Sequence, residues 1–230
     1  MFDQIAIEKQ QTQATFLAKV YGWMALALLV TALAAMYVAN DPKLIETIIL
    51  NRVVFWVLII GEVGLVWYLS ARVFSMSPEK ATMLFFVYAL LNGLTLSVIF
   101  LVYDIQSIGT TFLITAGTFS AMSAYGYFTK KDLTSFGSML IMVLFGVIIA
   151  SVVNMFIEST MLDKIITYVG VLVFVGLIAY DTQKLKNIQE GNHDAETVKK
   201  LSIMGALTLY LDFINLFILL LKIFGGRKDD

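Results

Sequence analysis

The chain has 230 residues, of which 59% are hydrophobic and 14% are charged, with a mean hydropathy of +0.84. Soluble domains carry about 25% charged residues, so this composition excludes an ordinary soluble domain and indicates a polytopic membrane protein. The net charge of −1 gives no basis for nucleic-acid binding, and the absence of cysteine excludes disulfides and thiolate metal sites.

The chain begins with a polar segment and two long apolar runs. Residues 1–18 are polar and carry acids, which predicts an uncleaved cytoplasmic tail. Residues 20–39 form an uncharged run, and residues 53–71 form a second that is interrupted only by Glu62 and followed by Arg72. At about 1.5 Å per residue, a helix of either length can cross a bilayer.

Five further apolar runs follow, at residues 81–103, 107–128, 135–157, 165–180 and 201–221. The connections are roughly three to twenty residues long, which leaves no room for an extra folded domain. We therefore predict an all-α integral membrane protein. Its seven transmembrane helices would occupy residues 19–224, with a short C-terminal tail at residues 225–230.

The basic residues predict the orientation of these spans. Of the 16 lysines and arginines, ten lie in loops on the N-terminal side and six on the other side. Basic loops stay in the cytoplasm, so the N-terminus is expected inside and the C-terminus outside. The alternative is a re-entrant last segment, because the C-terminal tail GGRKDD is also basic.

The last predicted span carries an aspartate, Asp212, at its centre. A charge at the bilayer midplane costs from about 2.5 kcal/mol upward, so a retained acid faces the protein interior, finds a partner or is protonated. Asp212 lies on one narrow stripe of the helix surface, which it shares with Gly205, Thr208 and Asn215. We expect other helices to surround this helix, with the stripe facing a shared interior.

A second acid, Asp181, lies near the cytoplasmic end of the sixth predicted span. Counted along the helical rise from that side, Asp212 lies about 16 Å up and Asp181 about 6 Å, and a shift of the span ends would close the gap. Two carboxylates in a dry site would share a proton and titrate as a coupled pair, which would make the site a pH sensor. The alternatives are a hydrogen bond from Asp212 to a neighbouring helix, and a helix-end ion pair of Asp181 with Lys184 or Lys186.

The remaining ionisable residues of the spans also have two interpretations each. Glu62 either lines an ion route or is a protonated interhelical donor. Arg72 is either a snorkelling anchor at the cytoplasmic surface or a clamp on one of the two aspartates.

Most enzyme classes are excluded by the residues present. A single histidine and no HExxH motif exclude a zinc protease and a Ser-His intramembrane protease. Tyr180-Asp181 followed by an aspartate on the last span resembles the arrangement in presenilin, a two-aspartate intramembrane protease. The fit is poor, because Leu209-Tyr210-Leu211 precedes Asp212 where those proteases have Gly-x-Gly. We predict that the protein is not an enzyme.

Two segments near the C-terminus resemble the Bax inhibitor 1 (transmembrane Bax inhibitor motif) family, and in particular its bacterial inner-membrane branch. They are Gly205–Phe217, GALTLYLDFINLF, and Ala179–Lys186, AYDTQKLK. The similarity covers essentially the whole chain, including Val20-Tyr-Gly-Trp23, Gly93-Leu-Thr-Leu-Ser97, Lys130-Lys-Asp132 and Phe224-Gly225.

The resemblance implies a seven-helix fold in which the last helix is central and is surrounded by two three-helix layers. It also implies a pH-sensitive calcium leak controlled by two aspartates, which fall by motif on Asp181 and Asp212. A basic residue of the second helix latches one aspartate in the family, and Arg72 is the nearest match. Glu62 lies where some members have a glutamate and others a neutral amide.

Our hypothesis is therefore a bacterial inner-membrane calcium leak with a cytoplasmic N-terminus and a periplasmic C-terminus. Asp181 and Asp212 would sense protons, gate the path and bind calcium transiently, and no cofactor is expected. Arg72, Glu62, Asn215 and Thr208 are candidates for the latch or the pore lining. The expected partners are the lipid bilayer, the calcium ion and another membrane protein. The alternatives are a regulator that binds a membrane protease or stress partner, a small-anion transporter and, less favoured, a two-aspartate protease.

Overall fold

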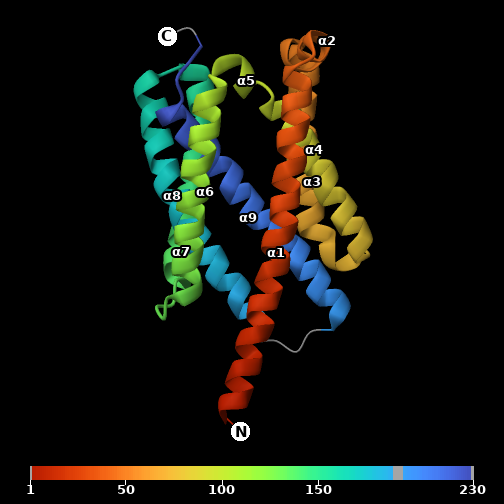
Figure 1. Ribbon diagram of the computed structural model, residues 1–230. Helices are drawn as coiled ribbons and strands as arrows, with labels where there is room; N and C mark the ends of the chain where they lie inside the picture. Colours follow the sequence, from red (N-terminus) through yellow and green to blue (C-terminus); the bar gives the residue numbers. More distant parts are fainter. Residues whose placement is uncertain (1, 189–193, 229–230) are drawn as a thin grey trace. The chain divides into compact units, whose positions relative to one another are not determined.

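The structure is a computed structural model that describes the backbone of residues 2–188 and 194–228 and the side chains from Gln11 onward within those ranges. The described residues are helical almost throughout (Figure 1). The long helices are α1 (Phe2–Ala39), α3 (Arg52–Arg72), α4 (Pro78–Leu96), α6 (Ile105–Phe128), α7 (Thr134–Ile157), α8 (Thr160–Ile188) and α9 (Ala195–Phe224). The short ones are α2 (Pro42–Leu44), a π-helical turn (Ile45–Leu50), a 3-10 turn (Val73–Ser75) and α5 (Ile99–Val102).

Polar caps mark where the apolar runs are interrupted. The Asn51 side chain accepts hydrogen bonds from the first free N–H groups of α3, and the Ser77 hydroxyl accepts one at the start of α4, where Pro78 takes the first helical position. Such caps satisfy N–H groups that have no partner within the helix. The α7 helix ends at Glu158, whose φ of 55° lies in the left-handed region.

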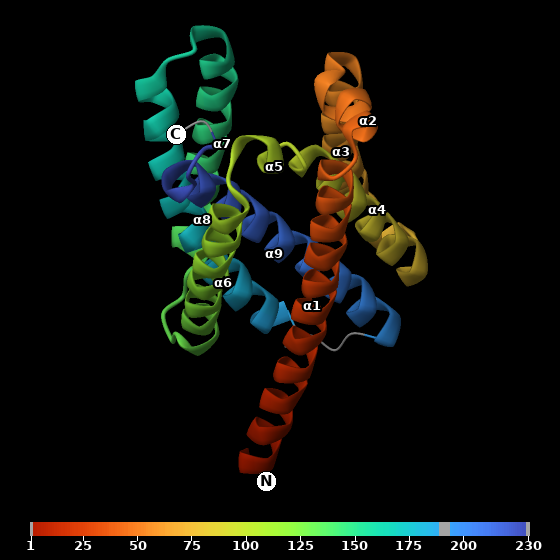
Figure 2. The same cartoon turned by 45° about the horizontal axis from the view of Figure 1, so that its top comes forward.

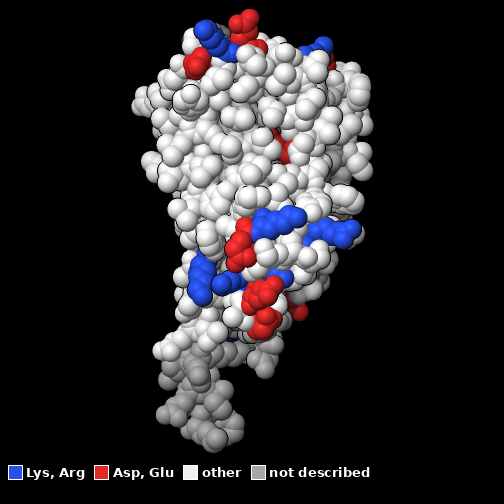
Figure 3. Space-filling model, turned by 90° about the vertical axis from the view of Figure 1, so that its right-hand side faces the viewer, with Lys and Arg blue, Asp and Glu red and all other residues white. Residues whose placement is uncertain are grey.

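Six helices within the described residues are long and apolar enough to cross a membrane. These candidate spans are Gln11–Ala39, Arg52–Ser75, Pro78–Val102, Thr134–Ile157, Thr160–Ile188 and Ala195–Phe224. Figure 3 agrees, because it shows a broad band that is uncharged apart from one acidic patch, with lysine, arginine, aspartate and glutamate side chains above and below it. The prediction of an all-α, multi-pass membrane protein is confirmed.

The expected count of seven crossings is not confirmed, because α6 is not among the six. This 24-residue helix carries no charged residue, but its many threonines, serines and glycines make it less apolar than the others. Its small polar residues form part of its buried face, where Thr115 and Ser123 lie. A crossing by α6 stays a prediction.

Two expected boundaries differ from the observed ones. The run at residues 81–103 is divided, since α4 ends at Leu96 and α5 begins at Ile99. The segment expected as an N-terminal tail, residues 1–18, is continuous with the first span, because α1 begins at Phe2. Helix formation continues past an apolar run when the flanking polar residues are themselves good helix formers, as the glutamines and lysines here are.

The chain forms two compact units. The first contains α1 to α5, the part of α9 up to Tyr210, and Arg227 and Lys228. The second contains α6, α7, α8 and the part of α9 from Leu211 on, up to Gly226. Helix α9 therefore contributes to both units.

In the first unit, α4 lies beside both α1 and α3, as Figures 1 and 2 show. The approach of α4 to α1 requires a glycine at position 93, because an added Cβ would lie 2.6 Å from the Thr31 carbonyl oxygen and 2.7 Å from the Ala34 Cβ. The first half of α9 joins this group through Tyr210, whose ring meets those of Phe85 and Tyr88 edge-on at 5.8 Å.

In the second unit, α8 packs against both α6 and α7. A side chain at Gly126 would meet the backbone of Ala179, and one at Gly137 would meet the ring of Tyr180. Glycines at these two positions therefore let the neighbouring helices approach the segment of α8 that carries Asp181. The second half of α9 packs on α6 through Phe213, whose ring lies 5.7 Å from that of Phe119.

Helix α9 is the most enclosed of the six candidate spans, with 67% of its apolar window buried compared with 6% for α7. This agrees with the buried last helix that Asp212 predicts. Its central position between two three-helix layers stays a prediction.

Candidate functional site

The structure brings together Asp181 and Asp212 within the second unit. Asp181 lies on α8 and is 9% exposed, and Asp212 lies on α9 and is 5% exposed. Their carboxyl groups are hydrogen-bonded to each other. An ionised carboxylate can only accept hydrogen bonds, so this contact needs one proton between the two groups.

The Asp212 carboxyl group has few other hydrogen-bonding neighbours among the described residues. Its Oδ2 atom is enclosed and has no hydrogen-bond partner among the described residues. Its neighbours one helical turn away on α9 are Thr208 and Asn215, which are half-buried and bond to their own helix. Thr208 Oγ1 donates to the Met204 carbonyl oxygen at 3.1 Å, and Asn215 Nδ2 donates to the Leu211 carbonyl oxygen at 2.8 Å. A buried oxygen without a donor is costly, which favours a proton on this carboxyl group.

The lysines near Asp181 are engaged elsewhere. Lys186 Nζ donates to the Tyr127 carbonyl oxygen at 2.8 Å, and Lys184 Nζ lies 5.9 Å from the centre of the Tyr180 ring. Lys184 attracts the Asp181 carboxyl group electrostatically, but neither lysine forms an ion pair with it among the described side chains. The helix-end ion pair, which was the alternative interpretation of Asp181, is therefore absent from the part of the chain that the structure describes.

Gln183 anchors the segment of α8 that carries Asp181. Its Oε1 accepts from the Leu133 N–H at 2.8 Å, and its Nε2 donates to the Lys131 carbonyl oxygen at 2.8 Å. One residue earlier, the Thr182 hydroxyl bonds to Ser123 on α6 at 3.3 Å. These bonds hold α8 to α6 and to the connection before α7, and so fix the backbone on one side of the aspartate pair.

A second buried polar cluster lies in the first unit and is centred on Glu62, which is 8% exposed. Its two carboxyl oxygens accept from Asn92 Nδ2 at 3.1 Å and from Thr95 Oγ1 at 2.9 Å. The Tyr210 hydroxyl donates to Asn92 Oδ1 at 3.0 Å and lies 2.7 Å from Thr31 Oγ1. The cluster joins α1, α3, α4 and α9, and both interpretations of Glu62, as part of an ion route or as a protonated interhelical donor, stay predictions.

Arg72 is exposed and ends α3. Its carbonyl oxygen accepts a hydrogen bond from the Ser75 hydroxyl at 2.8 Å, and its guanidinium forms no ion pair among the described residues. It belongs to the first unit, whereas the aspartates belong to the second. A latching role for Arg72 stays a prediction.

The described residues contain no group of three or more His, Cys, Asp or Glu side chains that could hold a metal ion. Two carboxyl groups supply at most four oxygen atoms, fewer than the six to eight ligands that calcium takes. Transient calcium binding by the pair stays a prediction.

Comparison with known proteins places these residues in a recognised family. The sequence profile of the family described as "Inhibitor of apoptosis-promoting Bax1" matches residues 13–229. The inner membrane protein YbhL of Escherichia coli is 54% identical over 216 residues, which cover 93% of this chain and 92% of the relative. A protein of Borreliella burgdorferi is 45% identical over 97% of both chains, and a membrane protein of Streptococcus pyogenes is 36% identical over 93% of both.

Proposed function

Since the chain belongs to the Bax inhibitor 1 family, we propose that it is a pH-sensitive calcium leak channel that is gated by the Asp181 and Asp212 pair. The observation that carries this proposal is the hydrogen bond between the two buried carboxyl groups. This hydrogen bond connects two helices. One is α8, which Gln183 anchors, and the other is α9, the most enclosed of the candidate spans.

Protonation is the step that would switch the pair. With one shared proton the two carboxyl groups attract each other and carry a single negative charge between them. Loss of that proton leaves two like charges in a dry site, where their repulsion is stronger than in water. The second half of α9 would then move away from α8, so the two protonation states correspond to two helix arrangements.

A hard divalent cation such as calcium suits the deprotonated pair. Hard cations prefer carboxylate oxygen, and two adjacent carboxylates would offset the charge of one divalent ion. Since no further carboxylate completes a cage among the described residues, the ion would be released easily. Glu62 and its donors supply a second polar position within a span, as a pore lining requires.

The name of the Escherichia coli relative supports a location in the bacterial inner membrane. The excess of lysine and arginine on the N-terminal side supports a cytoplasmic N-terminus and a periplasmic C-terminus. In this proposal the protein is not an enzyme and needs no cofactor, and its partners are the lipid bilayer, the calcium ion and another membrane protein.

The same aspartate contact favours one competing function, a two-aspartate protease, because two carboxyl groups that share a proton can also activate water. The two functions differ in whether calcium crosses the membrane and whether a peptide is cleaved. A leak passes calcium in pure lipid vesicles without any protein substrate, whereas a protease passes none and cleaves a membrane-embedded peptide.

The test is calcium entry into vesicles that contain the purified protein and an enclosed calcium dye. We expect entry above that of protein-free vesicles, altered by both Asp181→Asn and Asp212→Asn. The matched control is Asp163→Asn, which removes an exposed acid from α8 that pairs with Lys222 at 2.9 Å. No entry with wild type would contradict the proposal. It would then favour a binding regulator, or an anion transporter if added anions exchange in the same vesicles.

A further inference from the structure

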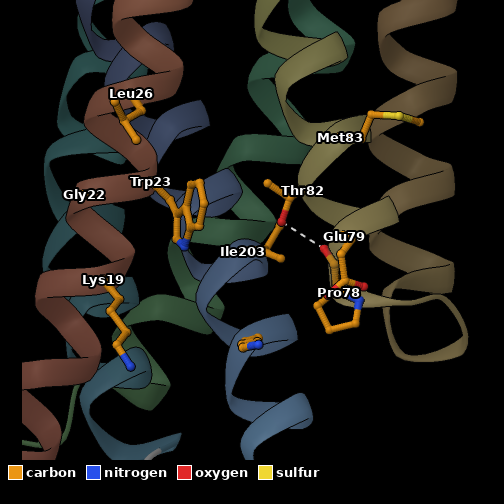
Figure 4. A pocket seen from close by; sticks show the side chains of 10 residues that line it. Lys19, Gly22, Trp23, Leu26, Pro78, Glu79, Thr82, Met83 and Ile203 are labelled. Atoms are coloured by element: carbon orange, nitrogen blue, oxygen red, sulfur yellow. Dashed lines mark hydrogen bonds between the residues drawn. The ribbon is translucent and has the colours of Figure 1, made fainter.

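The first unit contains a pocket of about 810 Å³ between α1, α4 and the first half of α9 (Figure 4). One side of it is open because α1 has a glycine there: a Cβ added to Gly22 would meet nothing within 4 Å. The pocket shares no residue with the aspartate pair or with the Glu62 cluster, so the proposed gate does not account for it.

The deeper part of the pocket is apolar. Trp23 extends from α1 toward α4, and Leu26 continues the same face one turn later (Figure 4). The Trp23 ring is held in place by an edge-on contact with Phe86 at 5.9 Å. Ile203 closes the α9 side and is 2% exposed, whereas Leu26 is 49% exposed. A long apolar chain could therefore enter from the outer surface of the span and lie against the indole.

The other end of the pocket is basic. Lys19 lies one turn before Trp23 on α1, and Lys199 lies one turn before Ile203 on α9. Each of these two helices therefore places a lysine one turn before a residue of the apolar wall. Glu79 on α4 is the one acid of this lining. The neighbouring Lys200 forms an ion pair with Glu196 at 2.7 Å and donates to the Phe74 carbonyl oxygen.

Charge at this end favours an anion. The two lysines exceed the single Glu79 by one positive charge. Glu79 accepts hydrogen bonds from the Ser77 hydroxyl and its own backbone N–H, and Lys199 and the neighbouring Lys200 both attract it, so an excess of positive charge remains at this end. Basic pockets between transmembrane helices bind the headgroups of anionic lipids, since the ammonium groups meet the phosphate while the acyl chains stay in the hydrocarbon region. An apolar wall with two lysines at one end matches such a molecule along its whole length.

We propose that this pocket binds one anionic phospholipid, with its phosphate between Lys19 and Lys199 and an acyl chain against Trp23 and Leu26. The lipid links α1 to the first half of α9 and completes the surface of the first unit. The proposal does not depend on calcium flux, so it stands or fails separately from the leak.

The test uses the fluorescence of Trp23, in a background where the other two tryptophans are removed by Trp56→Phe and Trp67→Phe. The protein is placed in vesicles of phosphatidylcholine that contain a small fraction of brominated lipid, either phosphatidylglycerol or phosphatidylcholine. We expect brominated phosphatidylglycerol to quench Trp23 with a preference of roughly tenfold over brominated phosphatidylcholine.

Two variants and one control locate the contact. The double substitution Lys19→Gln and Lys199→Gln should remove the preference for the anionic lipid, whereas Lys43→Gln, which changes a lysine outside the pocket, should keep it. Gly22→Leu should fill the pocket and lower the quenching by both lipids, without loss of folding because its added Cβ meets open space. Equal quenching by the two lipids in the wild-type pocket would overturn the proposal, and so would a preference that survives the double substitution.

Discussion

Asp181 on α8 and Asp212 on α9 share a hydrogen bond between carboxyl groups that are both buried, and Asp212 Oδ2 has no donor among the described residues. A proton must lie between the two groups for this contact to exist. We propose that the pair acts as a switch, because removing this proton would change attraction between the two carboxyl groups into repulsion.

The shared proton can be observed directly. Infrared spectroscopy should find a protonated carboxyl band in the wild-type protein that disappears in both Asp181→Asn and Asp212→Asn, since each variant removes one member of the pair. Asp163→Asn should leave the band in place, because Asp163 is exposed and ion-paired with Lys222. A band that persists in both pair variants would assign the proton to another group and remove the basis of the switch.

The Glu62 cluster should contribute to stability. Glu62→Ala leaves the buried Asn92 Nδ2 donor without its acceptor and leaves the Thr95 hydroxyl with only the Asn92 carbonyl oxygen, which should lower the free energy of unfolding by about 1–3 kcal/mol. Tyr210→Phe removes only a hydroxyl and should cost about 1 kcal/mol. Reversible unfolding in mixed detergent micelles measures both. A Glu62→Ala protein as stable as wild type would show that these hydrogen bonds do not hold the four helices together.

Two glycines of the first unit should respond in opposite ways to alanine. Gly93→Ala forces a Cβ against the Thr31 carbonyl oxygen and Ala34, so it should destabilise the protein by about 1–3 kcal/mol. Gly22→Ala meets open space within a helix and should be neutral or stabilise by up to about 1 kcal/mol. The same unfolding measurement compares them, and equal effects would contradict the close packing of α1 on α4.

A surface aspartate provides an independent pH reference. Hydrogen bonds from the Thr134 hydroxyl and backbone N–H lower the pKa of Asp132 below its ordinary value. A carboxyl group with a depressed pKa stabilises the fold above the unfolded pKa of about 3.9, and this contribution is lost as the pH falls through the folded value. Carbon-detected NMR should show Asp132 titrating below a free aspartate, and Thr134→Val should raise its pKa by removing the hydroxyl. A pKa unchanged by that substitution would exclude the hydroxyl as its cause.

The helices could be predicted from the sequence because long apolar runs and their polar ends determine them locally. A contact between Asp181 and Asp212 could also be predicted from the sequence, since a lone acid in an apolar span needs a partner. The Gln183 anchor and the Glu62 cluster were not predicted. Their bonds depend on how each helix is rotated toward its neighbours, and the sequence patterns of α4 and α8 leave that rotation open. The polar residues of Gly93-Leu-Thr-Leu-Ser97 and of the segment around Gln183 were the available signal.

The composition of α6 shows a related limit. An uncharged run of sufficient length predicts a membrane span, but threonine and serine lower the hydropathy of this helix, and Ser123 bonds to Thr182 on α8. Residues that pack against another helix need not be apolar. Hydropathy alone therefore does not decide whether α6 crosses the membrane.

The most direct test of the central claim is the rate of calcium entry into protein-containing vesicles over a series of pH values. We predict that the wild-type rate changes through one titration and that Asp181→Asn and Asp212→Asn each give a rate independent of pH, whereas Asp163→Asn keeps the wild-type profile. A pH profile that is unchanged in both pair variants would contradict the gate.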